Sequence, residues 1–364
     1  MSAFQMCSSA PHRAVLGLLS VAQGAAATGA LRSDLQETAP EDLIQIATFN
    51  YVHTVLAEAF RLAPALRFEF EPDAIIYLEE MQRENERRNA AVLTQLKEIG
   101  AAFAKEGMAA VTLKGAARLL TSDDATLRQR FLSDVDLLVP EDRIDLASDI
   151  LKALGGVPED RPEDRLGGRH HLAPFWSEQW TVPVELHIGT GRTEIAAALP
   201  AHDIFAAAAP AAPGLLVPSA VHRVLHLVLH AQFSDRRGVL SLLSIRDCWE
   251  ASAYQVDFGA DCVAEASALA ATSATDTNWD GFWDASAALH SGAPPVSDWA
   301  KAAFRNFGDT AGRQRQAVAA RLFGMLRTAW KTREGRKRYL SGAVTFRGWR
   351  KLIRSLSDLR HRTR

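Results

Sequence analysis

In the segment from Phe131 to Val139 two carboxylates lie two residues apart and an apolar run follows them, and few folds accommodate such a segment. Side chains alternate between the two faces of a β-strand, so Asp134 and Asp136 should point to the same side. Two buried neighbouring acids raise each other's pKa, and a divalent cation removes that cost. The segment therefore predicts a strand with a magnesium site near its start. The alternative is a surface strand with two solvated acids, but the apolar continuation over 137–139 argues against full exposure.

The composition is that of a globular chain, with 364 residues, 48% of them hydrophobic, and a formal net charge of −2. This length suits one large domain or two ordinary ones. The three cysteines, Cys7, Cys248 and Cys262, have no CxxC spacing and cannot all pair, which indicates a reducing compartment. We therefore expect a cytoplasmic protein. The Ala-rich stretch 14–31 contains polar residues and glycines, so it is weak as a membrane span, and a signal peptide is the alternative interpretation.

The charge is unevenly distributed along the chain. From Arg321 onward Lys and Arg are frequent, and only Glu334 and Asp358 oppose them. Such a basic segment suggests docking on the acidic body of the protein, on an anionic surface or on a nucleic acid. Apolar residues at helical spacing over 352–359 favour an amphipathic helix docked on the body or on a membrane, so nucleic acid ranks lower.

Helical periodicity dominates both ends of the chain, and strand patterns lie between them. The predicted fold is an α/β core within helical segments, divided into an N-terminal helical region (1–106), a core (107–200) and a C-terminal helical region with a basic tail (201–364). We expect long helices over 41–62 and 73–106, strands at 109–113 and 134–139, a polar loop at 121–130, a hairpin of 169–176 and 181–188, and no strand after Pro200.

Two further segments carry residues suited to phosphate chemistry. In Leu113-Lys114-Gly115-Ala116 a strand leads through a glycine into a helix, where a phosphate can approach the backbone and the helix N-terminus. In the strand pattern 182–188, Glu185 and His187 share one face. Each feature alone is weak, because strand-to-helix glycines and strand acids are common. Together with the acid pair they supply the three carboxylates that two metal ions need for an in-line attack on a nucleoside triphosphate.

These segments together resemble the uncharacterised nucleotidyltransferase family of the DNA-polymerase-β-like superfamily. The resemblance rests on Leu-Lys-Gly-Ala at 113–116, on Arg-Phe-Leu-Ser-Asp-Val-Asp-Leu-Leu-Val at 130–139 and on Val-Glu-Leu-His at 184–187, and it extends over most of the chain. It implies a nucleotidyltransferase-type mixed sheet flanked by helices. It also implies transfer of an NMP group from an NTP, with ATP as the expected donor, to an unidentified acceptor (a small molecule, a peptide or protein, or RNA), with release of pyrophosphate.

The resemblance also assigns roles to residues. Asp134, Asp136 and Glu185 are the expected catalytic residues and the ligands of two Mg²⁺ ions. It places Gly115 at the phosphate turn. Beside the resemblance, we expect Lys114, Arg130, Ser133 and His187 to contact the nucleotide as well. One departure matters, because the superfamily usually has Gly or Ser after the turn glycine, whereas this chain has Ala116 and lacks that hydroxyl. Lys114, or Arg128 and Arg130 from the following loop, could contact the triphosphate instead.

Other interpretations stay open at this point. A catalytically degenerate module that binds a nucleotide, a peptide or a partner enzyme is the main alternative, and Ala116 favours it. His222, His226 and His230 line one helix face, which is better suited to packing near the rim of the site than to zinc, because no third ligand is evident. The His170-His171 pair falls on a predicted strand near the acids. The tryptophans Trp279, Trp283, Trp299, Trp330 and Trp349 are expected in the core or at an interface.

Overall fold

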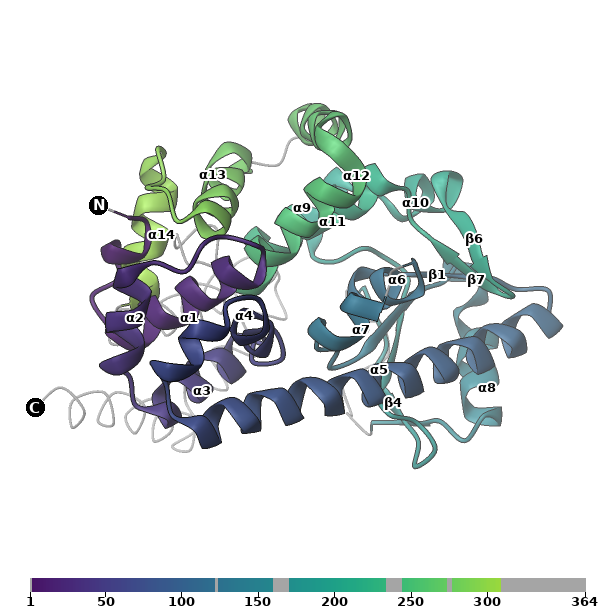
Figure 1. Cartoon of the computed structure of the whole chain (residues 1–364). Coiled ribbons are helices and arrows are strands. Elements are labelled where there is room, and N and C mark those ends of the chain that lie inside the picture. The colour runs from purple at the N-terminus through teal and green to yellow at the C-terminus, as the bar shows by residue number, and fades with distance from the viewer. Residues whose placement is uncertain (1, 122–123, 160–169, 234–243, 274–276, 309–364) are drawn as a thin grey trace, which may run out of the picture. The chain divides into compact units, whose positions relative to one another are not determined.

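The computed structural model describes residues 2–121, 124–159, 170–233, 244–273 and 277–308 (Figure 1). They belong to one compact unit, Met1–Gly308. This unit combines a seven-stranded mixed sheet with many helices, so the α/β prediction is confirmed. Within the described ranges there is no helix with both the length and the hydrophobicity of a membrane span.

The α-helices are α1 (Ala10–Ala22), α2 (Gly29–Gln36), α3 (Pro40–Phe49), α4 (Leu56–Leu62), α5 (Pro72–Lys105), α6 (Lys114–Thr121), α7 (Asp124–Gln129), α8 (Ile144–Ala153), α9 (Thr193–Ala198), α10 (Ala201–Ala207), α11 (Ala220–Phe233), α12 (Ile245–Thr272), α13 (Trp279–Ser291) and α14 (Asp298–Gly308). Short 3-10 helices are η1 (Phe4–Met6), η2 (Pro64–Phe68) and η3 (Glu141–Arg143). The strands are β1 (Ala110–Thr112), β2 (Val135–Leu138), β3 (Val157–Pro158), β4 (Phe175–Trp176), β5 (Val184–His187), β6 (Ala209–Ala212) and β7 (Leu215–Val217).

The strand order in the sheet is β3-β4-β5-β2-β1-β7-β6. The central pair, β2 and β5, is parallel, and β2 runs antiparallel to β1 on its other side. β1 and β7 are parallel, whereas the outer pairs β3–β4, β4–β5 and β6–β7 are antiparallel. The two acid-bearing strands predicted from the sequence are therefore direct neighbours in the middle of the sheet.

Alternation along the strands divides the hydrophobic core into two layers. Val135 and Leu137 of β2, with Val184 and Leu186 of β5, pack with residues of α5 and α8 on one face of the sheet. On the other face, Leu138 packs with residues of α9, α11 and α12. Because alternate residues point to opposite faces, Asp136, Glu185 and His187 lie on the α9–α11 side. The functional residues therefore point away from the α5–α8 layer and toward α9 and α11.

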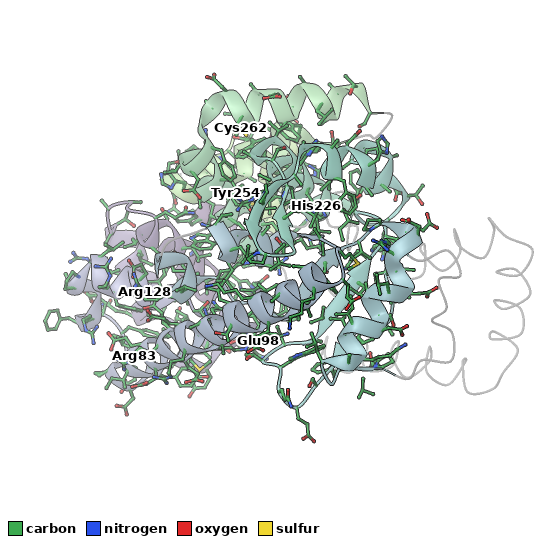
Figure 2. All side chains as sticks on the ribbon, turned by 90° about the vertical axis from the view of Figure 1, so that its right-hand side faces the viewer. Arg83, Glu98, Arg128, His226, Tyr254 and Cys262 are labelled. Atoms are coloured by element: carbon green, nitrogen blue, oxygen red, sulfur yellow. The ribbon has the colours of Figure 1, made fainter. Side chains whose placement is uncertain are left out.

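The long helix α5 connects the sheet with a second, entirely helical core (Figure 1). Pro72 occupies its first turn, as its fixed φ favours, and the helix ends before Gly107, which has φ +62°. Its C-terminal half packs on the sheet layer, while residues of its first turns join the core formed by α1–α4, η2, α13 and α14. Arg83 and Glu98 lie exposed along its outer side (Figure 2).

Several predictions of individual elements are confirmed and others are wrong. The helix 73–106 and the strands around 110 and 136 are present. The helix predicted over 41–62 is instead two helices, α3 and α4, separated at Tyr51, whose φ is +57°. The predicted loop 121–130 contains the short helix α7. Two strands follow Pro200, contrary to expectation, and the turn signal Pro213-Gly214 joins them into a hairpin on the β1 edge.

The proposed boundaries at 106/107 and 200/201 stay predictions, although the sheet continues to Val217. The basic segment from Arg321, with Trp330 and Trp349, lies outside the described residues. Trp279, Trp283 and Trp299 pack against the helical core, as expected.

Candidate active site

The acids of the two central strands lie side by side on the same face of the sheet. Asp136 on β2 pairs in register with Glu185 on β5. His187 lies two residues further on the same face, and its Nε2 is 2.8 Å from Asp136 Oδ1 and 3.5 Å from Glu185 Oε2. One ligand atom from each of Asp136, Glu185 and His187 lies within 4.8 Å of the other two. These three residues are a candidate site for a divalent cation.

Lys114 supplies a positive charge to this group from the start of α6. Its backbone is in the left-handed region, with φ +49°, which is uncommon for a residue other than glycine. Its Nζ lies 3.1 Å from Asp136 Oδ2. Burial alone would raise the pKa of Asp136, but Lys114 and His187 hold that pKa well below its usual range. In turn, Asp136 raises the pKa of both Lys114 and His187 against the opposing effect of burial.

Asp134 lies outside the group of three ligand atoms. It precedes the first residue of β2, and its side chain accepts a hydrogen bond of 3.2 Å from the exposed Ser133 hydroxyl. Burial and the negative charge of Asp136 raise the pKa of Asp134. The predicted acid pair thus lies close enough to interact, but only Asp136 is brought together with Glu185.

Arg130 and Gly115 lie in direct contact at the start of α6. A Cβ atom at Gly115 would lie 2.9 Å from Arg130 Nε, so this glycine makes room for a guanidinium. Arg130 also forms an ion pair of 2.7 Å with Glu250 of α12. Arg118 shares the same acid at 3.7 Å, and all three side chains are at least nine-tenths buried. Two buried guanidiniums therefore depend on one carboxylate.

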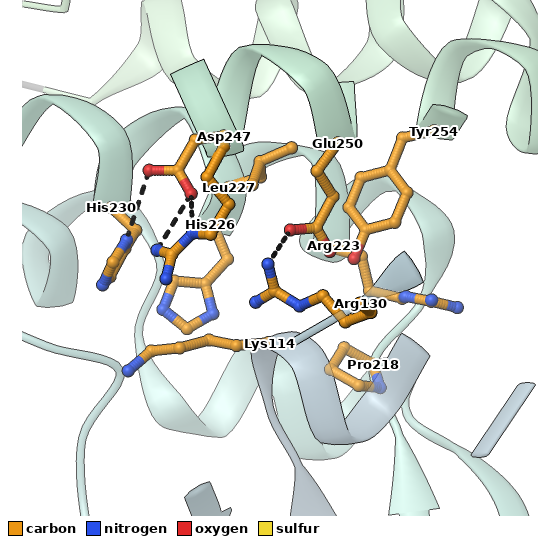
Figure 3. A pocket seen from close by; sticks show the side chains of 11 residues that line it. Lys114, Arg130, Pro218, Arg223, His226, Leu227, His230, Asp247, Glu250 and Tyr254 are labelled. Atoms are coloured by element: carbon orange, nitrogen blue, oxygen red, sulfur yellow. Dashed lines mark hydrogen bonds and ion pairs between the residues drawn. The ribbon is translucent and has the colours of Figure 1, made fainter. Parts of the chain in front are cut away.

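A pocket on the helical side of Lys114 collects further positive charge (Figure 3). Figure 3 shows Lys114 along its floor and Arg130 pointing toward Glu250. Four cationic side chains and two acids are among the lining residues, which are Lys114, Arg130, Pro218, Arg223, His226, Leu227, His230, Arg246, Asp247, Glu250 and Tyr254. A surplus of cationic groups in a partly enclosed pocket is suited to an anion.

Arg223 carries most of that surplus. Arg246 and Asp247 form an ion pair at 3.0 Å, so their charges balance. Among the described residues, Arg223 has no acidic partner: its guanidinium donates to the Thr121 hydroxyl at 3.0 Å and lies against the rings of Tyr254 and Phe258. Its Nε, which is buried, has no hydrogen-bond partner. The Arg223 side chain is thus held in place by packing, and its Nε–H is left free to bind a ligand.

A second hollow lies on the other side of Lys114, above Glu185 and His187. Its cavity volume is about 230 Å³. The lining residues are Lys114, His170, His171, Glu185, His187, Thr190, Gly191, Arg192, Ile195 and His230. Lys114 and His230 line both hollows, so the two spaces meet at these side chains. A ligand could contact the acids from one hollow and the cationic groups from the other.

The histidines noted in the sequence have different environments. His170 and His171 lie beside His187, with ring centroids 5.6 and 5.1 Å from it. Burial and the neighbouring His187 lower the pKa of His170 to about 4. His226 and His230 line the cationic pocket, and burial with Lys114 lowers the pKa of His226 to about 3. Two of the three histidines of α11 thus lie at the site, as the helical spacing suggested, whereas His222 lines neither hollow.

Sequence reasoning missed several residues of the cationic pocket. Arg223 and Glu250 occupy unremarkable helical positions, and so does Arg118, which does not line the pocket but pairs with Glu250. The signal available was a charged residue on an otherwise apolar helix face. Arg128, considered for a phosphate contact, instead approaches Glu86 at 3.9 Å.

A mixed sheet with facing acids on neighbouring parallel strands, covered by helices and next to a cationic pocket, defines a nucleotidyltransferase-type fold. The chain belongs to the uncharacterised nucleotidyltransferase family, whose profile matches residues 36–278. This match confirms the family resemblance and contains all the predicted site residues. No curated protein and no solved structure matches the chain.

Proposed function

We propose that the protein is a metal-dependent nucleotidyltransferase that transfers an NMP group from an NTP to an acceptor and releases pyrophosphate. ATP is the expected donor. One observation carries the proposal: Lys114, in contact with Asp136, separates the acid group from a pocket with a cationic surplus. Nucleotidyl transfer needs both parts, because negative charge must hold a cation while positive charge holds the leaving pyrophosphate.

The residues fit a divalent cation by their chemistry. Asp136, Glu185 and His187 each offer one ligand atom, these atoms lie within 4.8 Å of one another, and Asp136 and His187 are buried. Asp136 and Glu185 would hold the ion, which when bound polarises the α-phosphate and lowers the pKa of an acceptor hydroxyl. Asp134, whose pKa is raised by burial and by the nearby charge of Asp136, is the proposed further ligand. The second Mg²⁺ predicted from the sequence stays part of the proposal.

The cationic pocket would hold the β- and γ-phosphates in place of the hydroxyl that Ala116 lacks. Arg223 has free donors, and Arg130 lies against the Gly115 turn where the helix begins. Guanidinium groups bind phosphate oxygens in bidentate fashion, which a single hydroxyl does not. Ser133 would act indirectly, because its hydroxyl donates to Asp134.

The test is pyrophosphate release from each of the four NTPs, with cell extract as the acceptor source, followed by transfer of label from α-³²P NTP. Asp136→Asn and Glu185→Gln should each lower the rate by at least about a hundredfold, since each removes a charge that acts on the reacting phosphate. Asp149→Asn is the matched control, because this carboxylate is 71% exposed on α8. Transfer undiminished in both site variants would contradict the proposal.

Arg223→Gln tests the phosphate part separately. It should weaken ATP binding about tenfold or more and leave AMP binding nearly unchanged, because AMP lacks the two phosphates assigned to the pocket. Arg192→Gln is the comparison variant, since Arg192 lines the other hollow. Equal losses for ATP and AMP in Arg223→Gln would place the triphosphate elsewhere.

A second candidate function is a binding module without catalysis. The observation in its favour is that Lys114 already balances the charge of Asp136. Calorimetry with a non-hydrolysable ATP analogue, with and without Mg²⁺, separates the two proposals. Metal-independent binding with no turnover on any acceptor would favour the module. The acceptor, the cytoplasmic location and the role of the basic segment from Arg321 stay predictions.

A further inference from the structure

We propose that the hollow above Glu185 and His187 binds the acceptor, and that the acceptor is a small hydroxyl compound with one anionic group, a phosphate or a carboxylate. Arg192 is the residue that we assign to this anion. The inference rests on the proposed function, because it concerns the second substrate of the same reaction. It goes beyond that function by choosing among a small molecule, a peptide or protein, and RNA.

The positions of the two hollows fit an in-line reaction. In an in-line displacement the attacking and leaving oxygens lie on opposite sides of the phosphorus. The cationic pocket is assigned to the β- and γ-phosphates, and only Lys114 and His230 line both that pocket and the second hollow. The attacking hydroxyl therefore belongs in the second hollow, whose wall includes Glu185 and His187.

The transfer step is balanced in this arrangement. The hydroxyl oxygen of the acceptor forms a bond to the α-phosphorus, while the bond from that phosphorus to the bridging oxygen breaks. Pyrophosphate leaves with the electron pair of the broken bond and occupies the cationic pocket. The hydroxyl proton passes to water, which reaches the hollow because the Glu185 side chain is 21% exposed.

The walls of the hollow indicate a small, polar acceptor. The cavity volume is about 230 Å³, and among the described residues that line it Ile195 alone has a purely hydrocarbon side chain. An apolar acceptor would find little to pack against. A nucleic-acid strand is held by several cationic side chains along its phosphates. In this hollow Arg192 is the only arginine among the described residues, and Lys114 already pairs with Asp136.

Arg192 supplies a positive charge that no acid of the described residues neutralises. The other charged groups of the hollow have partners: Lys114 Nζ lies 3.1 Å from Asp136 Oδ2, and Glu185 Oε2 lies 3.5 Å from His187 Nε2. Arg192 is exposed and forms no ion pair within the described part of the chain. Its guanidinium can therefore bind the two oxygens of a phosphate or a carboxylate through parallel hydrogen bonds.

The backbone around Arg192 is fixed while its side chain is free. The buried Thr190 hydroxyl donates to the carbonyl oxygen of Leu199 at 2.7 Å, so it anchors the turn and is not available to a ligand. The carbonyl oxygen of Arg192 accepts from the Ala196 N–H at 2.8 Å. A guanidinium on a fixed backbone loses less conformational freedom when it binds an anion.

The first experiment measures binding without turnover. The full-length protein is saturated with Mg²⁺ and α,β-methylene-ATP, which cannot transfer its nucleotidyl group, and glycerol 3-phosphate, glycerate and glycerol are titrated by calorimetry. We expect at least one of the two anionic compounds to bind at least about tenfold more tightly than glycerol. The tighter of the two identifies the anion as phosphate or carboxylate. Arg192→Gln should remove the difference from glycerol, and Arg192→Lys should keep part of it.

Arg143→Gln is the matched control. Arg143 is an exposed arginine at the end of η3 that lines neither hollow and forms no ion pair within the described part of the chain. This variant should bind all three compounds like the unaltered protein. In the transfer assay, Arg192→Gln should raise the KM for the anionic acceptor at least about tenfold and leave the KM for ATP unchanged.

Several results would overturn the proposal. They are absence of binding by both anionic compounds, equal binding of glycerol, and behaviour of Arg192→Gln that matches Arg143→Gln. Transfer to RNA, to a peptide or to a neutral acceptor at an unaltered rate in Arg192→Gln would also overturn it, and would leave nucleotidyl transfer in place. Conversely, anion binding that depends on Arg192, without pyrophosphate release from any NTP, would contradict the proposed function and keep only the anion site.

Discussion

Gly115 and Arg130 form a close contact, in which an added Cβ on the glycine would lie 2.9 Å from the guanidinium Nε. Gly115, which the sequence suggested as a point where a phosphate approaches the backbone, therefore makes room for the Arg130 side chain. Arg130 cannot move away freely, because it is buried and pairs with Glu250 at 2.7 Å. The turn and the cationic pocket are thus one structural unit.

Gly115→Ala should disturb this unit. Alanine gains up to about 1 kcal/mol of helix propensity, but overpacking against a fixed guanidinium costs about 1–3 kcal/mol, so we expect a net loss of about 1 kcal/mol in the free energy of unfolding. ATP binding should weaken as well. Urea unfolding and calorimetry measure the two effects.

Gly29→Ala is the control for helix propensity, because Gly29 begins α2 and an added Cβ there meets nothing within 4 Å. It should leave the protein unchanged or slightly more stable. If Gly115→Ala behaves like Gly29→Ala, the contact with Arg130 is not a constraint.

Glu250→Gln should be among the most destabilising single changes in the protein. This acid is 2% exposed and lies 2.7 Å from Arg130 and 3.7 Å from Arg118, so the variant leaves two buried guanidiniums without a counter-charge. Breaking a buried ion pair costs about 3–5 kcal/mol. Glu84→Gln, which removes an exposed pair with Arg87, should cost less than about 1 kcal/mol. Equal unfolding midpoints in urea for the two variants would contradict the described arrangement.

The sequence was sufficient to predict the central strands and the acids on them, because a period of two with apolar neighbours depends only on local residues. It was also sufficient to predict helix α5, because the apolar stripe and the proline at its start are signals within the helix sequence itself. It could not show that Asp136, and not Asp134, is the acid that contacts His187, because that depends on the register of β2 against β5. The cationic pocket could be predicted only in part: Lys114 and Arg130 were expected nucleotide contacts, but Glu250, which pairs with Arg130, is far away in sequence and lies in no distinctive motif.

Asp247 should make the free energy of unfolding depend on pH in the acid range. Burial alone would raise its pKa, but Arg246, His230 and Ser244 hold it well below the ordinary value of 3.8. A carboxyl whose pKa is lower in the folded state stabilises the protein above its unfolded pKa, and this contribution is lost as the pH falls through the folded pKa. The unaltered protein should therefore exceed Asp247→Asn in stability by a constant amount down to about pH 5, and the difference should shrink below about pH 4.

Urea unfolding at a series of pH values measures this difference directly. Asp203→Asn is the control, because Asp203 is half-exposed on α10 and its ion pair is with the exposed His202. Its stability relative to the unaltered protein should vary little over the same range. A difference for Asp247→Asn that stays constant down to the lowest pH would contradict the ion pair with Arg246.

The three cysteines should separate into one accessible and two protected thiols. Cys7 and Cys248 are buried, and burial raises the pKa of the Cys248 thiol far above its ordinary value. Cys262 is only partly buried on α12, after the kink at Gly259. Because the thiolate is the reactive form, a disulfide reagent at pH 8 should modify Cys262 first and the other two only as the protein unfolds. Cys262→Ser should remove the fast phase completely, whereas a fast phase that survives this substitution would mean that one of the buried thiols is exposed in solution.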